Sequence, residues 1–213
     1  MNHLGRLYSK LFSVMSHKIN PTGIPAGAKS KGVLFIHIPK AAGSSISLSL
    51  YGIQVGHIPA KKYYLSNRKE FADIKSFSIV RDPINRFTSA YYFLCSGGMT
   101  LGDKVNYDKY LSQYVDINQY IDSLTLDFVN SGKILHLLPQ HYFLYYKNTC
   151  IVNYVYNLET LNPKQIEQDL NISWDVGHKN TSKSSKPVAL TNESIEKLKN
   201  LYQRDLYLFG YNL

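Results

Sequence analysis

Residues 38–45, I-P-K-A-A-G-S-S, combine a lysine, a glycine and two serines, which are residue types that bind small anions. They follow an apolar run and precede a helical pattern. A strand that turns tightly into a helix exposes backbone N–H groups and the positive end of the helix dipole. Lys40 adds a point charge, Gly43 lets a ligand approach the backbone, and Ser44 and Ser45 add hydroxyl donors. The segment therefore predicts an oxyanion-binding loop.

This loop differs from the phosphate loop of ordinary nucleoside triphosphatases. In the pattern G-x-x-x-x-G-K-[ST] the lysine directly follows the second glycine, whereas Lys40 precedes Gly43 by three residues. No cluster of Asp and Glu suited to magnesium accompanies it, so we predict no metal site. A nucleotide kinase or NTPase is kept as an alternative function.

A second segment at residues 78–93, S-I-V-R-D-P-I-N-R-F-T-S-A-Y-Y-F, predicts a phosphate clamp. Arg81 ends an apolar run, and Ser89 lies about two turns into the helix expected next. A forked guanidinium beside a hydroxyl suits phosphate. Because ligands of parallel sheets bind at the carboxyl ends of the strands, we expect Arg81 to face the same crevice as Lys40. Arg86 is expected either to pair with Asp82 or to contact the ligand.

Alternation of strands and helices predicts an α/β fold, a P-loop-like three-layer domain with a mainly parallel central sheet flanked by helices. The first expected strand, at residues 33–37, is β-branched and aromatic without polar alternation, which is typical of a strand buried on both faces. Further strands are expected at residues 77–80 and 150–156. Helices are expected at residues 46–51, 84–94, 163–170 and 191–207, with polar helical segments across 103–138.

Together, the two anion-binding segments resemble the co-substrate motifs of sulfotransferases that use 3′-phosphoadenosine 5′-phosphosulfate (PAPS). The resemblance is closest to the carbohydrate sulfotransferases that include the heparan sulfate 2-O-sulfotransferases, and it covers roughly residues 32–213. Later landmarks of that family are matched by H-L-L-P-Q-H-Y-F-L at 136–144, Y-V-Y-N-L-E-T-L at 154–161, G-H-K-N-T-S at 177–182 and Y-Q-R-D-L-Y-L-F-G-Y at 202–211.

The resemblance implies PAPS as sulfuryl donor, adenosine 3′,5′-bisphosphate as product and a set of donor-binding residues. Lys40 would neutralise charge on the leaving phosphate within the 5′-phosphosulfate loop, and Arg81 and Ser89 would hold the 3′-phosphate. A late basic loop would close over the nucleotide. The implied donor-binding residues are Lys40, Ala42, Gly43, Ser44, Ser45, Arg81, Ser89, Lys179, Asn180 and Ser182.

A hydroxyl acceptor needs a general base, and His57 in Q-V-G-H-I-P is our prediction. Histidine titrates near neutral pH, and the resemblance implies a catalytic histidine in a similar Gly-His context before the second motif. The residues after His57 match the family poorly. His37 is expected to be buried inside the first strand, and Glu159 to be a structural acid. The alternative bases are His136, His141, Glu70 and Asp73.

The overall charge favours an anionic partner. The chain of 213 residues carries 24 Lys and Arg against 15 Asp and Glu, which gives a net charge of +9. With 18 tyrosines, a non-catalytic nucleic-acid-binding module is a further alternative. Tyr91-Tyr92 and Tyr145-Tyr146 lie inside apolar segments, which favours core and cleft walls instead. The resemblance implies a saccharide or polysaccharide acceptor, and nucleic acid is not needed to explain the charge.

The domain organisation expected is simple. Residues 1–20 predict an amphipathic helix that caps the domain or rests on a membrane surface, 21–32 a linker, and 33–213 a single sulfotransferase domain. Because no signal peptide or apolar run of membrane-spanning length is apparent, we expect a cytoplasmic protein, with peripheral membrane contact as the alternative. Two cysteines cannot form a disulfide framework.

Overall fold

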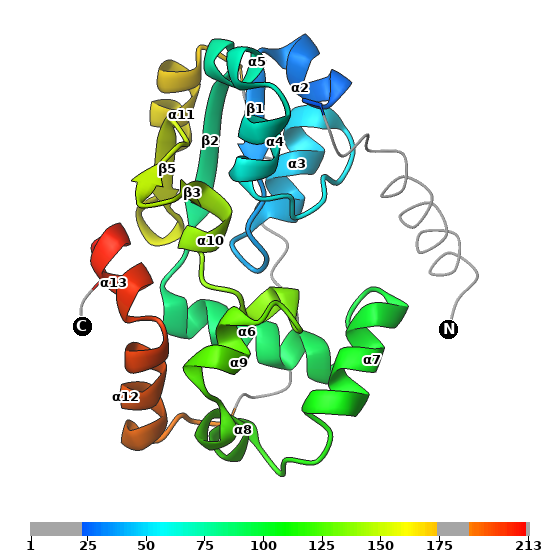
Figure 1. The fold of residues 1–213 in the computed structure, drawn as a ribbon, viewed down its shortest axis with the longest axis vertical. Coiled ribbons are helices and arrows are strands. Elements are labelled where there is room, and N and C mark those ends of the chain that lie inside the picture. Colours follow the sequence, from blue (N-terminus) through cyan, green and yellow to red (C-terminus); the bar gives the residue numbers. More distant parts are fainter. Residues whose placement is uncertain (1–22, 174–187, 212–213) are drawn as a thin grey trace.

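A parallel three-stranded sheet organises the protein (Figure 1). The computed structural model describes residues 23–173 and 188–211, so the expected helix at 1–20 and the late loop with Lys179, Asn180 and Ser182 lie outside the described residues. The strands are β1 (Val33–Ile36), β2 (Lys75–Val80) and β5 (Tyr154–Asn157). Their order is β1-β2-β5, with both pairings parallel, which confirms the α/β prediction.

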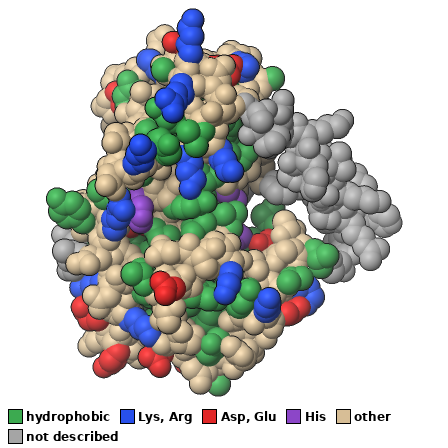
Figure 2. Space-filling view, viewed as in Figure 1, with side chains coloured by type: hydrophobic (Ala, Val, Ile, Leu, Met, Phe, Trp, Pro, Cys, Tyr) green, Lys and Arg blue, Asp and Glu red, His purple; other side chains and the backbone are tan. Residues whose placement is uncertain are grey.

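The chain passes from the sheet into a group of helices through α6 (Pro83–Cys95), which begins three residues after β2. Asp82 caps this helix by accepting a hydrogen bond from Asn85 N at 2.7 Å, and Pro83 occupies its first turn, as predicted. Figure 1 shows the sheet in one half of the molecule and α6 in the other. In Figure 2, histidine side chains are visible at the level where the two halves meet.

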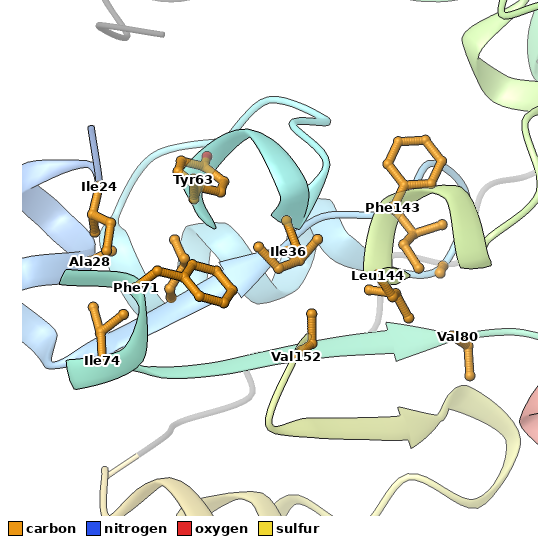
Figure 3. Close-up of a cluster of buried hydrophobic side chains, with 14 of the residues drawn as sticks. Ile24, Ala28, Ile36, Tyr63, Phe71, Ile74, Val80, Phe143, Leu144 and Val152 are labelled. Carbon is orange, nitrogen blue, oxygen red and sulfur yellow. The ribbon is translucent and has the colours of Figure 1, made fainter. Parts of the chain in front are cut away.

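Both faces of the sheet are covered by helices. Leu34 and Ile36 of β1 pack in one cluster of buried side chains (Figure 3), whereas Val33 and Phe35 pack in another on the opposite face. The first cluster is covered by α2 (Ala26–Lys31), α4 (Ala60–Ser66), α5 (Arg68–Asp73) and α10 (His141–Leu144). The second is covered by α3 (Gly43–Tyr51) and α11 (Pro163–Leu170). This burial on both faces explains why β1 has no polar alternation.

A third buried cluster holds the helical half together. Phe87, Tyr120 and Tyr202 are fully buried in it, so part of the tyrosine excess is core, as predicted. Its elements, with the adjoining helix α13, are α6, α7 (Leu101–Tyr110), α8 (Ile117–Ser123), α9 (Leu126–Asn130), η1 (Leu135–Leu137), α12 (Asn192–Leu201) and α13 (Gln203–Phe209). None of the helices in the described ranges is long and apolar enough to cross a bilayer.

Three segments differ from expectation. The expected linker contains α2, in which Ala28 is buried, because its alanines and lysines favour a helix that Gly32 ends at a φ of 66°. The third strand begins later than expected, because Cys150 pairs with Tyr145 in an antiparallel hairpin of β3 (Tyr145–Tyr146) and β4 (Thr149–Cys150). The last expected helix is interrupted at Tyr202, which separates α12 from α13.

Candidate active site

The loop between β1 and α3 has the backbone of an anion-binding turn. Lys40 and Ala42 have φ values of 66° and 61°, a left-handed conformation that is unfavourable for residues other than glycine. Ala42 is the N-cap of α3, and no side chain of the described residues caps this helix. The first N–H groups of α3, around Gly43 and Ser44, therefore lack a side-chain acceptor, as at helix N-termini that bind anions.

Gly43 is required by a close contact with His37. A Cβ atom at position 43 would lie 1.9 Å from His37 Cδ2, so any side chain there would displace the imidazole. His37 is only 4% exposed, as predicted, and its Nδ1 lies 2.9 Å from the carbonyl oxygen of Val55. Burial, helped by nearby His57, lowers the pKa of His37 to about 3. His37 is thus a neutral packing partner of the loop.

Arg81 lies beside the Lys40 loop, as the sequence predicts. Its Nη1 donates to the carbonyl oxygen of Lys40 at 3.4 Å. Its backbone is held by Gln140, which accepts from Arg81 N at 2.9 Å and donates to Arg81 O at 2.7 Å. Asp205 accepts from Gln140 N at 2.6 Å and fixes that residue in turn. Burial and the neighbouring Arg81 lower the pKa of Lys40, while Asp103 opposes the shift.

The three serines predicted to bind the donor are all partly accessible. Ser44, Ser45 and Ser89 are each half-buried, the first two at the start of α3 and the third in α6. Ala42 is exposed. Lys40 and Arg81 stand adjacent at the carboxyl ends of β1 and β2, with the two serines of the loop at the start of α3.

Both expectations for Arg86 are wrong. The guanidinium is completely buried and donates to the carbonyl oxygens of His136 at 3.0 Å and Leu138 at 2.8 Å. It thus holds the segment that carries His136 against α6 and reaches neither Asp82 nor a ligand. Sequence spacing could not reveal partners that lie 50 and 52 residues away.

Replacing Arg86 by lysine is expected to lower the free energy of unfolding by about 3 kcal/mol, because one ammonium cannot serve two diverging carbonyl groups. Urea unfolding followed by circular dichroism measures the loss. The matched control is Arg68→Lys on exposed α5, which should leave the urea midpoint almost unchanged. Equal midpoints for the two variants would contradict this role of Arg86.

His57 lies over His37, at a ring-centroid distance of 4.1 Å. Its Nδ1 is 3.0 Å from the carbonyl oxygen of His37, and since a carbonyl oxygen only accepts, Nδ1 carries the proton of the neutral ring. Nε2 is then left with a lone pair. Burial lowers the pKa of His57, although the hydrogen bond to His37 opposes the shift. A neutral imidazole with a free Nε2 is suited to accept a proton.

His136, one of the alternative bases, lies near His57. Phe93 and Asp103 lie beside His136, and the sequence analysis did not identify either of them. The rings of His57 and His136 are 6.2 Å apart, and Phe93 lies 5.0 Å from His136. The ammonium of Lys40 rests 4.1 Å from the centre of the Phe93 ring. The capping pattern Thr100-x-x-Asp could have marked the start of α7, but nothing in it indicates that this helix reaches the histidines.

The other candidate bases lie elsewhere or have structural partners. Glu70 forms an ion pair with Lys29 of α2, and Asp73 ends α5 just before β2 begins, so both are at the amino end of the sheet and cannot act at its carboxyl end. His141 Nδ1 pairs with Asp205 at 2.6 Å. Glu159 accepts from Asp82 N at 2.9 Å and from the Tyr211 hydroxyl at 2.7 Å, the structural role expected of it.

Within residues 23–173 and 188–211, no three His, Cys, Asp or Glu side chains are arranged to hold a metal ion. Both cysteines are free thiols.

Comparison with known proteins bears directly on this arrangement. The model of the family described as "Sulfotransferase family" matches residues 27–212, which includes both anion-binding segments and the histidines between and after them. Neither the curated proteins nor the solved structures contain a match to the chain. Because the family model spans most of the chain, including the loop of Lys40 and the strand end of Arg81, this protein is an enzyme that belongs to the sulfotransferase family.

Proposed function

We propose that this sulfotransferase moves the sulfuryl group of PAPS in line to a hydroxyl of a saccharide or polysaccharide, as in the branch that includes the heparan sulfate 2-O-sulfotransferases. The observation that carries the proposal is the meeting of three groups at one edge of the sheet. These are the left-handed loop of Lys40, the guanidinium of Arg81 and the neutral imidazole of His57.

The residues present fit a donor with phosphate groups at both ends of a nucleoside. Lys40, the uncapped start of α3 and its two serines would hold the 5′-phosphosulfate. Arg81 and Ser89 would hold the 3′-phosphate, with Lys179, Asn180 and Ser182 closing over the nucleotide. In transfer, charge develops on the phosphate oxygen that departs, and Lys40 is the cation for it. A sulfuryl group carries less charge than a phosphoryl group, so this mechanism needs no magnesium.

We assign His57 as the general base that takes the proton of the acceptor hydroxyl. As the acceptor oxygen bonds to sulfur, the bond from sulfur to the bridging phosphate oxygen breaks and leaves its electron pair on the phosphate. The hydroxyl proton passes to Nε2 of His57, whose Nδ1 is already protonated and bonded to the His37 carbonyl. The lowered pKa of His57 supports this role, because it keeps the ring neutral at physiological pH.

A cavity of about 340 Å³ has an aromatic and basic lining of the kind that suits an anionic saccharide. Lys61 lines it, and the ammonium of Lys61 lies 4.1 Å from the centre of the Tyr142 ring. On the face in Figure 2, lysine or arginine side chains flank hydrophobic ones. Aromatic rings pack against the apolar faces of sugars, and lysines attract carboxylate or sulfate groups. The cavity is lined by Lys61, Asn130, His141, Tyr142, Tyr145, Tyr146 and Lys147.

Adenosine 3′,5′-bisphosphate is expected to stabilise the protein more than other nucleotides do. At a concentration about a hundred times its Kd it should add about 2.7 kcal/mol to the free energy of unfolding. For a chain of this size that corresponds to a rise in Tm of about 5–10 °C. Thermal-shift measurements with ATP and magnesium, and with an oligonucleotide, are the controls. An equal response to ATP would favour the kinase or NTPase alternative, and a larger response to the oligonucleotide the nucleic-acid-binding module.

The acceptor class is tested by incubating the protein with radiolabelled PAPS and a panel of neutral and acidic glycans, phenols and peptides. Label recovered in glycans supports the proposal. Label recovered only in phenols or peptides contradicts the saccharide part and leaves the donor assignment intact.

A further inference from the structure

Asp103 is a buried carboxylate whose two oxygens have different surroundings. Its side chain is 9% exposed and lies in the first turn of α7. Oδ2 accepts three hydrogen bonds, from Met99 N at 3.0 Å and from the N and Oγ1 of Thr100 at 2.9 Å each. Oδ2 is therefore occupied by the cap of the helix, which leaves Oδ1 for a different partner.

Oδ1 points to the histidine group. It lies 3.7 Å from Nδ1 of His136, a buried atom that has no hydrogen-bond partner among the described residues. Gly98 makes the approach of Asp103 possible, because a Cβ at position 98 would lie 2.1 Å from the Asp103 Cβ, and its φ of 62° also favours glycine. The chain thus brings one carboxylate oxygen to an imidazole nitrogen that otherwise lacks a partner.

The charges around Asp103 are mostly positive. Lys40 rests on the same Phe93 ring that packs against His136, and Arg81 lies next to Lys40. Arg86 bonds to the His136 carbonyl. Asp103 raises the pKa of Lys40 and of His136 against the opposing effects of burial, and the pKa of His136 still falls to about 4. His136 is consequently neutral at physiological pH.

We infer that Asp103 is a positioning residue for sulfuryl transfer, which holds the proton of neutral His136 on Nδ1 and supplies a negative charge beside the contact cluster of His136, Phe93 and Lys40. This inference rests on the proposed function for the role of Lys40. His136 lies beside the carboxylate, with Nδ1 at 3.7 Å from Oδ1. The charge of Asp103 also raises the pKa of Lys40 and of His57, whereas Arg81 lowers the pKa of Lys40 and Arg86 that of His136. Asp103 touches neither the donor nor the acceptor in this scheme and acts through its neighbours.

Replacing Asp103 by asparagine tests the inference, because the amide oxygen can still accept the hydrogen bonds of the cap while the charge is lost. The Kd for adenosine 3′,5′-bisphosphate is measured by calorimetry across neutral and alkaline pH. Affinity should fall as Lys40 loses its proton, and in Asp103→Asn the midpoint of this fall should move down by about one pH unit. The control is Thr100→Val, which weakens the cap and lowers Tm but should leave the midpoint in place.

A second measurement needs neither a variant nor a ligand. In wild-type protein with ¹⁵N-labelled histidine, NMR shifts should identify His136 as the tautomer protonated on Nδ1. Protonation on Nε2, or the same alkaline midpoint in Asp103→Asn as in wild type, would overturn the inference. If wild-type protein fails to bind the bisphosphate, the proposed function is contradicted, and the tautomer of His136 still decides the role of Asp103.

Discussion

Replacing Lys40 by alanine is expected to reduce sulfuryl transfer about 10²–10³-fold, the loss typical when one donor to a developing oxyanion is removed. The ammonium is held over Phe93, and the Lys40 carbonyl oxygen accepts from Arg81, in the loop before the uncapped helix α3. No other side chain of the described loop 38–45 carries a charge that could replace it. Initial rates with radiolabelled PAPS and the glycan that accepts label measure the loss.

The Lys40→Ala substitution should leave the backbone conformation of the loop unchanged. Lysine and alanine both carry a Cβ, so the strain of a φ of 66° at position 40 is the same in both proteins. The Tm without ligand should therefore stay close to that of wild type. Lys62→Ala, at an exposed position of α4, serves as the control for a general loss of positive charge. If the two variants transfer sulfate equally well, Lys40 does not stabilise the leaving phosphate.

Replacing His57 by alanine is expected to reduce transfer about 10²–10⁴-fold, which is the range for loss of a general base. Binding of adenosine 3′,5′-bisphosphate should remain, since His57 is assigned to the acceptor proton and not to the donor. Arg81→Ala provides the contrast, because it should weaken the bisphosphate itself. Calorimetry and single-turnover transfer separate the two effects. Wild-type transfer by His57→Ala would require a different base.

The pH dependence of transfer gives an independent check on His57. A general base acts in its unprotonated form, and burial lowers the pKa of this ring from its usual value of 6.5. Transfer by wild type should thus persist below pH 6.5 and decline only as the pH falls through the lowered pKa. In His57→Ala the residual rate should lose this acidic decline. A wild-type decline centred above 6.5 would assign the base to a different group.

The strands and the two anion-binding segments could be predicted because their signals are local. Apolar residues marked β1 and β2, and the residues after each strand had to emerge at the same edge of a parallel sheet. The proximity of Lys40 and Arg81 follows from that register alone. The same reasoning placed Pro83 correctly at the start of α6.

The remaining parts of the site depend on contacts between distant segments. Asp103 reaches His136 and Gln140 reaches Arg81 between segments that lie far apart in the sequence, and no periodicity in the sequence records such pairings. Arg86 illustrates the difficulty, because the sequence favours Asp82, four residues earlier, as its partner. In the structure Arg86 instead donates to the buried carbonyl oxygens of His136 and Leu138, since these acceptors would otherwise lack hydrogen bonds.

The link from Arg81 through Gln140 to Asp205 has a consequence for the order in which the protein folds. Its hydrogen bonds join residues separated by 59 and 65 positions, and closing such long loops is slow because their entropy must be lost first. A chain that has formed its sheet but not yet docked α13 leaves the backbone of Gln140 without its anchor. The donor crevice would then be among the last parts to become rigid, so a folding intermediate should lack activity even with its strands in place.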